Sequence, residues 1–206
     1  MCRYIIDADI IIKLGNYEHE NYLDSIISKI SENLYIHEYV YMHEIRECGK
    51  AKNRLDDLVR AGKIRVMSEN DLITEEEKAS YDIVYSGLVN DFGIDKADTR
   101  GKNKGEAMSI AMAAAKQYKY LISDDKDAKI YAKRRADVET LNMNGIIVML
   151  KNNQKYFNIS RKDAKSLYLY PYNPNVARNL EEKIKFTKAL DRMKKRFDNE
   201  LWVVDD

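Results

Sequence analysis

The sequence has few of the residues that crosslink a chain or break its secondary structure. Among 206 residues there are two cysteines, Cys2 and Cys48, and two prolines. Two cysteines cannot form the disulfide framework of a small secreted domain, so we expect a reducing compartment. The chain also lacks an apolar run of about 18 residues that would span a membrane, and it does not begin like a signal peptide. We therefore expect a cytoplasmic protein that does not enter the membrane.

The composition is that of a folded chain with one principal core. Hydrophobic residues make up 45% and charged residues 33%, which argues against disorder. Residues 1–150 carry 22 Lys and Arg against 26 Asp and Glu, whereas residues 151–206 carry 13 against 8. We predict a domain over 1–150 and a basic, mainly helical C-terminal extension over 151–206. The basic surplus suits contact with a polyanion, but a solvated helical face explains it equally well.

Short β-favouring runs alternate with segments of helical spacing along residues 1–150. Strands are predicted at 4–6, 34–36, 64–66, 120–122 and 138–141. Helices are predicted after the first strand and at 21–31, 38–47, 55–61, 74–88, 106–118, 126–135 and 145–151. This alternation predicts an α/β fold with a central, mostly parallel sheet covered by helices. In the extension, residues 167–170 alternate like a strand and 179–199 form a charged helical pattern.

Acidic residues follow two of the predicted strands directly. Asp7 and Asp9 come after the first strand, and Asp124, Asp125 and Asp127 come after strand 120–122. In parallel sheets the carboxyl ends of strands are where functional groups gather. Carboxylates placed together repel one another unless a cation neutralises them, and Mg²⁺ and Mn²⁺ prefer oxygen ligands. Helix capping by aspartate explains the same positions one by one.

Two glutamates elsewhere in the chain are further candidates, each with an ordinary structural interpretation. Glu106 opens an alanine-rich helix, where a negative charge is favourable by itself. Glu44 lies in the helix predicted after the second strand, where glutamate is commonly solvated, and Glu38 and Glu47 are rivals for its role. Neither glutamate is decisive alone. We therefore compare the order of all the acidic residues along the chain with that of known families.

That order resembles the PIN-domain family, the VapC-like metal-dependent ribonucleases, over about residues 3–150. The resemblance rests on Asp7 ending the first strand, Glu44 in the following helical region, Lys104-Gly105-Glu106-Ala107 opening a helix, and Leu121-Ile122-Ser123-Asp124-Asp125-Lys126-Asp127. It implies a three-layer α/β/α PIN-like fold. One departure is that Asp9 and Ile10 stand where the family has threonine or serine after the first acid.

The resemblance also implies an activity, a cofactor and partners. Mg²⁺ or Mn²⁺ would be bound by Asp7, Glu44, Glu106 and Asp125, with Asp124 and Asp127 as neighbouring ligands. The expected activity is that of an endoribonuclease on single-stranded or structured RNA, with an antitoxin-like protein as partner if the chain is the toxin of a toxin-antitoxin pair. We also expect a homo-oligomer. The predicted positive contacts to the RNA backbone are Lys13, Lys102, Lys104, Lys126, Lys129 and the basic tail.

Three other interpretations remain open. A haloacid-dehalogenase-like phosphatase would use Asp7-Ala8-Asp9, although the Gly-Thr turn expected after the second acid is replaced by Ile10-Ile11-Ile12. A response-regulator receiver ranks third. A catalytically silent PIN-like module would bind RNA or protein without cutting. The histidines His19, His37 and His43 lack zinc-site spacing with the cysteines and are expected to be surface or capping residues.

Overall fold

A computed structural model of the protein describes residues 3–16, 21–27, 33–95, 101–143 and 145–146. The chain divides into two units, Met1–Asn142 and Met143–Asp206, and the sheet with its helices belongs to the first. The predicted boundary near residue 150, the extension 151–206 and its strand and helix lie outside the described residues.

The first unit is built on one sheet of five strands in the order β3-β2-β1-β4-β5. The strands are β1 (Tyr4–Ile6), β2 (Leu34–His37), β3 (Ile64–Met67), β4 (Tyr120–Ile122) and β5 (Glu139–Leu141). Every pairing between them is parallel. All five lie where the sequence predicts them, within one residue at either end. The buried, mostly apolar side chains of β1, β2 and β4 explain this agreement at the centre of the sheet, because both of its faces are covered.

The helices are α1 (Ala8–Gly15), α3 (Lys50–Arg60), α4 (Glu75–Phe92), α5 (Lys104–Ala115) and α6 (Lys126–Ala136). Thr74 and Glu77 form the predicted capping box at the start of α4. Two predictions need correction: the helix expected at 38–47 ends at Glu44 with the π-helical turn η2 (Val40–Glu44), and α3 begins at Lys50 instead of residue 55. Of the helix expected at 21–31, the described part contains the π-helical turn η1 (Leu23–Ile27), and residues 28–31 lie outside the described residues.

The corrections have local physical causes. The η2 turn closes with a wide hydrogen bond, 3.1 Å from the Ile45 backbone nitrogen to the Val40 oxygen, and this ends the helix before residue 47. Helix α3 starts early because Ala51 is buried and extends the apolar face of Leu55 and Leu58 by one turn. An alanine carries little weight in a hydrophobic pattern, so this turn was missed. The 3-10 turn η3 (Glu69–Asp71), between β3 and α4, was also not predicted.

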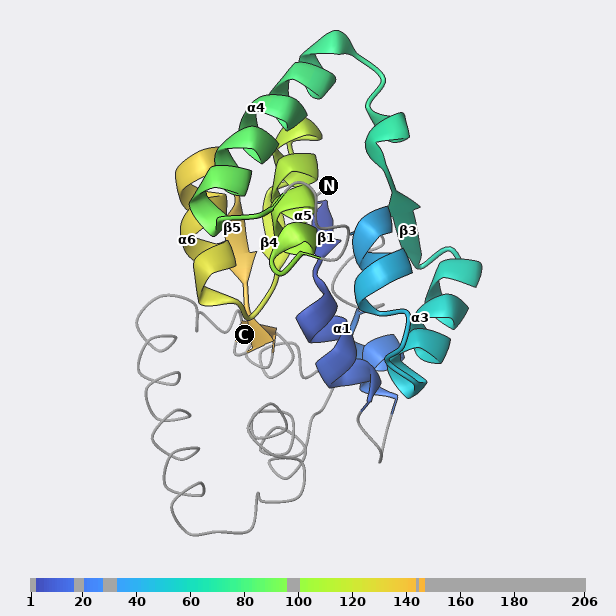
Figure 1. Ribbon diagram of the computed structural model, residues 1–206. Helices are drawn as coiled ribbons and strands as arrows, with labels where there is room; N and C mark the ends of the chain where they lie inside the picture. Colours follow the sequence, from blue (N-terminus) through green and yellow to red (C-terminus); the bar gives the residue numbers. More distant parts are fainter. Residues whose placement is uncertain (1–2, 17–20, 28–32, 96–100, 144, 147–206) are drawn as a thin grey trace, which may run out of the picture. The chain divides into compact units, whose positions relative to one another are not determined.

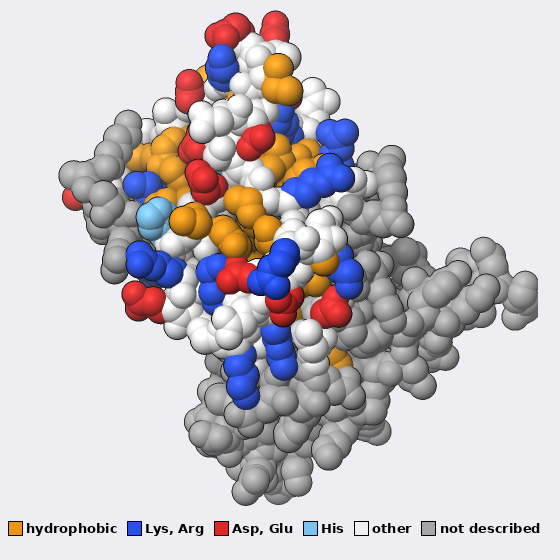
Figure 2. Space-filling view, turned by 90° about the vertical axis from the view of Figure 1, so that its right-hand side faces the viewer, with side chains coloured by type: hydrophobic (Ala, Val, Ile, Leu, Met, Phe, Trp, Pro, Cys, Tyr) orange, Lys and Arg blue, Asp and Glu red, His pale blue; other side chains and the backbone are white. Residues whose placement is uncertain are grey.

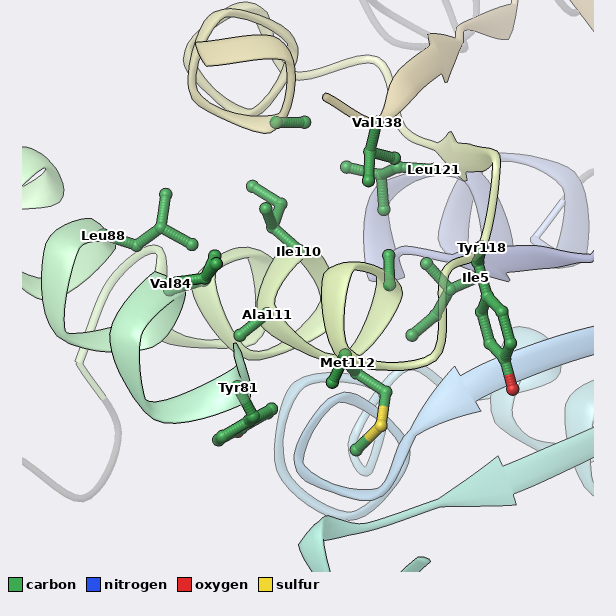
Figure 3. Close-up of a cluster of buried hydrophobic side chains, with 14 of the residues drawn as sticks. Ile5, Tyr81, Val84, Leu88, Ile110, Ala111, Met112, Tyr118, Leu121 and Val138 are labelled. Atoms are coloured by element: carbon green, nitrogen blue, oxygen red, sulfur yellow. The ribbon is translucent and has the colours of Figure 1, made fainter. Parts of the chain in front are cut away.

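Helices cover both faces of the sheet, as Figure 1 shows, with α4, α5 and α6 grouped on one side and α1 and α3 on the other. The core on the first side joins Ile5 and Leu121 of the sheet to Leu88, Ile110 and other residues of the helices, as shown in Figure 3. The predicted three-layer α/β/α fold with a central parallel sheet is confirmed for this unit, and the sheet is wholly parallel. None of the helices in the described ranges has the length and apolar character needed to cross a bilayer.

The strand order makes one place on the sheet a natural site. Central β1 lies between β2 and β4, and the helices that follow β1 and β4, α1 and α6, leave toward opposite faces. The connections therefore diverge above the carboxyl ends of these two strands, which is where α/β sheets bind ligands.

Candidate active site

Asp7 lies at the carboxyl end of β1, beside the end of β4. Ile6 is in register with Ile122, and the Asp7 backbone nitrogen donates a 3.0 Å hydrogen bond to the Ile122 oxygen. Its side chain is 1% exposed. One carboxylate oxygen accepts from the Ala8 nitrogen at 2.8 Å and the other from the Ser123 hydroxyl at 3.0 Å. Asp7 is therefore both the N-cap of α1 and a buried carboxylate at the carboxyl ends of β1 and β4.

Asp9, which the sequence analysis did not include among the ligands, is brought into the same place. Its Oδ2 accepts a 2.8 Å hydrogen bond from the Asp124 backbone nitrogen, while its Oδ1 is buried without a hydrogen-bond partner in the described structure. Lys13 Nζ lies 2.6 Å from Asp124 Oδ2 and 3.6 Å from Asp9 Oδ2. Lys13, predicted to contact the RNA backbone, is thus bonded to the acids, and the Asp124 carboxylate is already paired.

Glu44 reaches the start of α5 from the end of η2. Its Oε1 accepts a 3.1 Å hydrogen bond from the backbone nitrogen of Gly105, in the first turn of α5. A Cβ at Gly105 would lie 2.3 Å from Glu44 Oε1 and 2.4 Å from Oε2, so only glycine admits the carboxylate to this helix end. Its rivals Glu38 and Glu47 have exposed side chains.

Glu106 and Asp125 complete the group from α5 and the start of α6. Glu106 lies in the first turn of α5, and its Oε2 is buried with no hydrogen-bond partner among the described residues. Asp125 is the N-cap of α6 and accepts hydrogen bonds from the backbone nitrogens of Asp127 at 2.7 Å and Ala128 at 2.8 Å. The side chain of Asp127 is exposed on α6. Of the three acids after β4, Asp125 is the one whose charge acts on Glu106.

The carboxylates act on one another electrostatically. Burial raises the pKa of Asp7 well above its usual value, and the charges of Asp9, Glu106 and Glu44 raise it further. Burial and the charge of Glu106 raise the pKa of Glu44 to about 7, against the opposing effect of the Gly105 hydrogen bond. Burial, with the charges of Asp125 and Asp9, raises the pKa of Glu106. The structure therefore joins the four predicted principal acids and Asp9 into one group with a surplus of negative charge.

The donor set fits a hard divalent cation. All of its side-chain ligands are oxygens, and Asp9 Oδ1 and Glu106 Oε2 are buried with no other partner in the described part of the chain. Within the described residues no three acidic, histidine or cysteine side chains already lie in the geometry of a metal site. Binding would therefore require side-chain rotations that draw the carboxylates together.

The chain was compared with protein families, curated proteins and solved structures. No family model and no curated protein matches the chain. A chain of the crystal structure of VapBC2 from Rickettsia felis bound to a DNA fragment from their promoter superposes with a TM-score of 0.42 at 13% identity, covering 68% of this chain and 97% of that one. A TM-score this low carries no argument about fold or function.

Proposed function

We propose that the protein is a Mg²⁺- or Mn²⁺-dependent nuclease that hydrolyses the phosphodiester bonds of RNA. The observation that supports it most is the position of Asp7, a carboxylate buried at the ends of β1 and β4, where the charges of Asp9, Glu106 and Glu44 act on it. Such a cluster destabilises the folded chain at neutral pH, and a bound divalent cation relieves the repulsion. Perturbed carboxylates gathered at the carboxyl ends of strands are typical of functional sites.

Each residue has a distinct part in this proposal. Asp7, Glu44, Glu106 and Asp125 hold the cation, with Asp9 as an added oxygen donor. The cation supplies activation of a water molecule and stabilisation of charge on the phosphate. Ser123 holds Asp7 through its hydroxyl and also accepts a 3.1 Å hydrogen bond from the Asp125 nitrogen, so it fixes both acids.

The experiment that tests the proposal is cleavage of a mixed RNA pool by wild-type protein, Asp7→Asn and Asp125→Asn, in Mn²⁺, in Mg²⁺ and in EDTA. Asparagine keeps an acceptor at both helix N-caps, so the variants should fold. Asp57→Asn is the matched control, since that carboxylate is 69% exposed on α3. We expect metal-dependent cutting that both site variants lose and the control keeps.

Other results would select a different function. RNA left intact by the wild type, with hydrolysis of small phosphomonoesters, would favour the phosphatase. RNA bound in EDTA and never cut would favour a silent binding module. The sequence resemblance alone supports a toxin role, an antitoxin-like partner and homo-oligomerisation. A small reading frame with a DNA-binding motif next to this gene would support the toxin role and the antitoxin-like partner.

A further inference from the structure

A cavity of about 680 Å³ lies next to the acids, at the same edge of the sheet. His37, the last residue of β2, is paired with Met67, the last residue of β3, and both His37 and Glu69 line the cavity. Its wall also includes His43, the neighbour of Glu44, and Met108, two residues after Glu106. No part of the proposed catalytic group uses this space.

The wall of the cavity includes His37, whose ring holds a buried N–H donor with no acceptor among the described residues. His37 is 1% exposed, which corrects the expectation of a surface histidine. Its Nδ1 accepts a 3.1 Å hydrogen bond from the Tyr39 backbone nitrogen, so the neutral ring carries its proton on Nε2. That Nε2 has no hydrogen-bond partner among the described residues. Burial lowers the pKa of His37, which favours the neutral ring. Buried donors are rarely left unpaired, so this one points to a ligand.

A carboxylate acceptor stands beside the donor. Glu69 Oε1 lies 3.8 Å from His37 Nε2, beyond hydrogen-bond distance. The hydroxyl of Tyr81 donates to the same Glu69 oxygen at 2.9 Å, and the capping box of Ser68 and Asp71 holds the η3 turn that carries it. A buried N–H donor of the cavity wall thus lies next to a half-exposed carboxylate that also accepts a hydrogen bond from Tyr81.

Aromatic and basic side chains surround this pair. The rings of Tyr39 and His43 lie 4.8 Å apart on the cavity wall, and Arg46 is an exposed lining residue. Figure 2 shows one face of the molecule, on which hydrophobic side chains lie among those of Lys, Arg, Asp and Glu. Aromatic rings stack on unpaired bases, and arginine contacts phosphate.

We propose that this cavity is a base-binding subsite that selects guanine from single-stranded RNA. Guanine places its O6 acceptor beside two adjacent donors, N1–H and N2–H, whereas adenine, cytosine and uracil do not offer two adjacent donors on that edge. His37 Nε2–H donates to O6, and the Glu69 carboxylate accepts from N1–H and N2–H. Single-stranded RNA is read through such edges. Its role in specificity rests on the proposed nuclease function, since a guanine bound here would place the cut in the RNA near that guanine.

The test is equilibrium binding of guanosine, adenosine, cytidine and uridine 5′-monophosphates in EDTA, measured by NMR or calorimetric titration. We expect guanosine monophosphate to bind at least about tenfold more tightly than the others, as paired base contacts give. Glu69→Gln keeps the acceptor for Tyr81 and replaces the other oxygen with a donor, so the preference should disappear. His37→Asn keeps an acceptor for the Tyr39 nitrogen and removes the Nε2 donor. Glu75→Gln, on an 88% exposed side chain of α4, is the control.

The outcomes separate the subsite from the catalytic proposal. Equal binding of the four nucleotides, or a guanine preference that folded Glu69→Gln retains, overturns the subsite. If His37→Asn unfolds, Glu69→Gln alone decides. Metal-dependent RNA cleavage without guanine selection leaves the nuclease standing and removes the subsite. Guanine selection in a protein that never cuts RNA keeps the subsite and removes the nuclease.

Discussion

Replacing Glu44 with glutamine should stabilise the metal-free protein at neutral pH. Burial and the charge of Glu106 raise the pKa of Glu44 to about 7 from its ordinary 4.5. A carboxyl with a raised pKa favours its protonated form in the folded state, so the unfolded chain binds fewer protons between these two values. Stability therefore falls as pH rises from 4.5 to about 7 and then levels off.

The size of the effect follows from the same values. At about 1.4 kcal/mol per pH unit, a pKa of about 7 against 4.5 corresponds to about 3 kcal/mol. Glutamine keeps an acceptor for the Gly105 nitrogen but makes a weaker hydrogen bond than a carboxylate, which costs about 1 kcal/mol. We expect Glu44→Gln to raise the free energy of unfolding by about 1 to 3 kcal/mol at pH 8 in EDTA. At pH 4.5 the gain should be small or absent.

The assay is urea unfolding of wild type and Glu44→Gln from pH 4.5 to 8 in EDTA, with Glu75→Gln as an exposed control. Adding Mg²⁺ should raise the stability of the wild type more than that of the variant, because a ligand bound only by the folded state stabilises it. A variant that is less stable than wild type at pH 8, or an equal difference at every pH, would refute the reasoning about this carboxylate.

Two further substitutions test close approaches in the fold. Gly105→Ala places a Cβ 2.3 Å from a Glu44 carboxylate oxygen, so the flexible side chain should move out, RNA cleavage should be lost, and thermal unfolding should change little. Gly15→Ala places a Cβ 2.6 Å from the Cα of Ala51, where backbone has to move, so urea unfolding should show a loss of about 1 to 3 kcal/mol. Gly87→Ala is the control for Gly15→Ala, because a Cβ at Gly87 would make only ordinary contacts. We expect it to raise the free energy of unfolding by up to about 1 kcal/mol. An unchanged cleavage rate for the first variant, or equal stability for the other two, contradicts these expectations.

Local sequence was sufficient for the strands and for most helices. Runs such as Tyr4–Ile6 and Tyr120–Ile122 are apolar and β-favouring on both faces, which suits strands buried between two helical layers. The capping box at Thr74 marks a helix start by chemistry that depends only on residues three apart. The π-helical turn at Val40–Glu44 was not predictable in this way, since its hydrogen-bond register carries no residue signature.

The sequence by itself determined the alternation of strands and helices and placed Asp7 and Asp125 at strand ends, because periodicity and chain order are local properties. Tertiary structure decided which acids meet. The parallel register of β1 and β4 joins Asp9 to Asp124 across 115 positions, and a glycine at 105 admits Glu44 to the start of α5. The tertiary structure also buried His37 beside Glu69, and no sequence motif links these two residues. Such contacts depend on distances through space, which strand order and helix packing set.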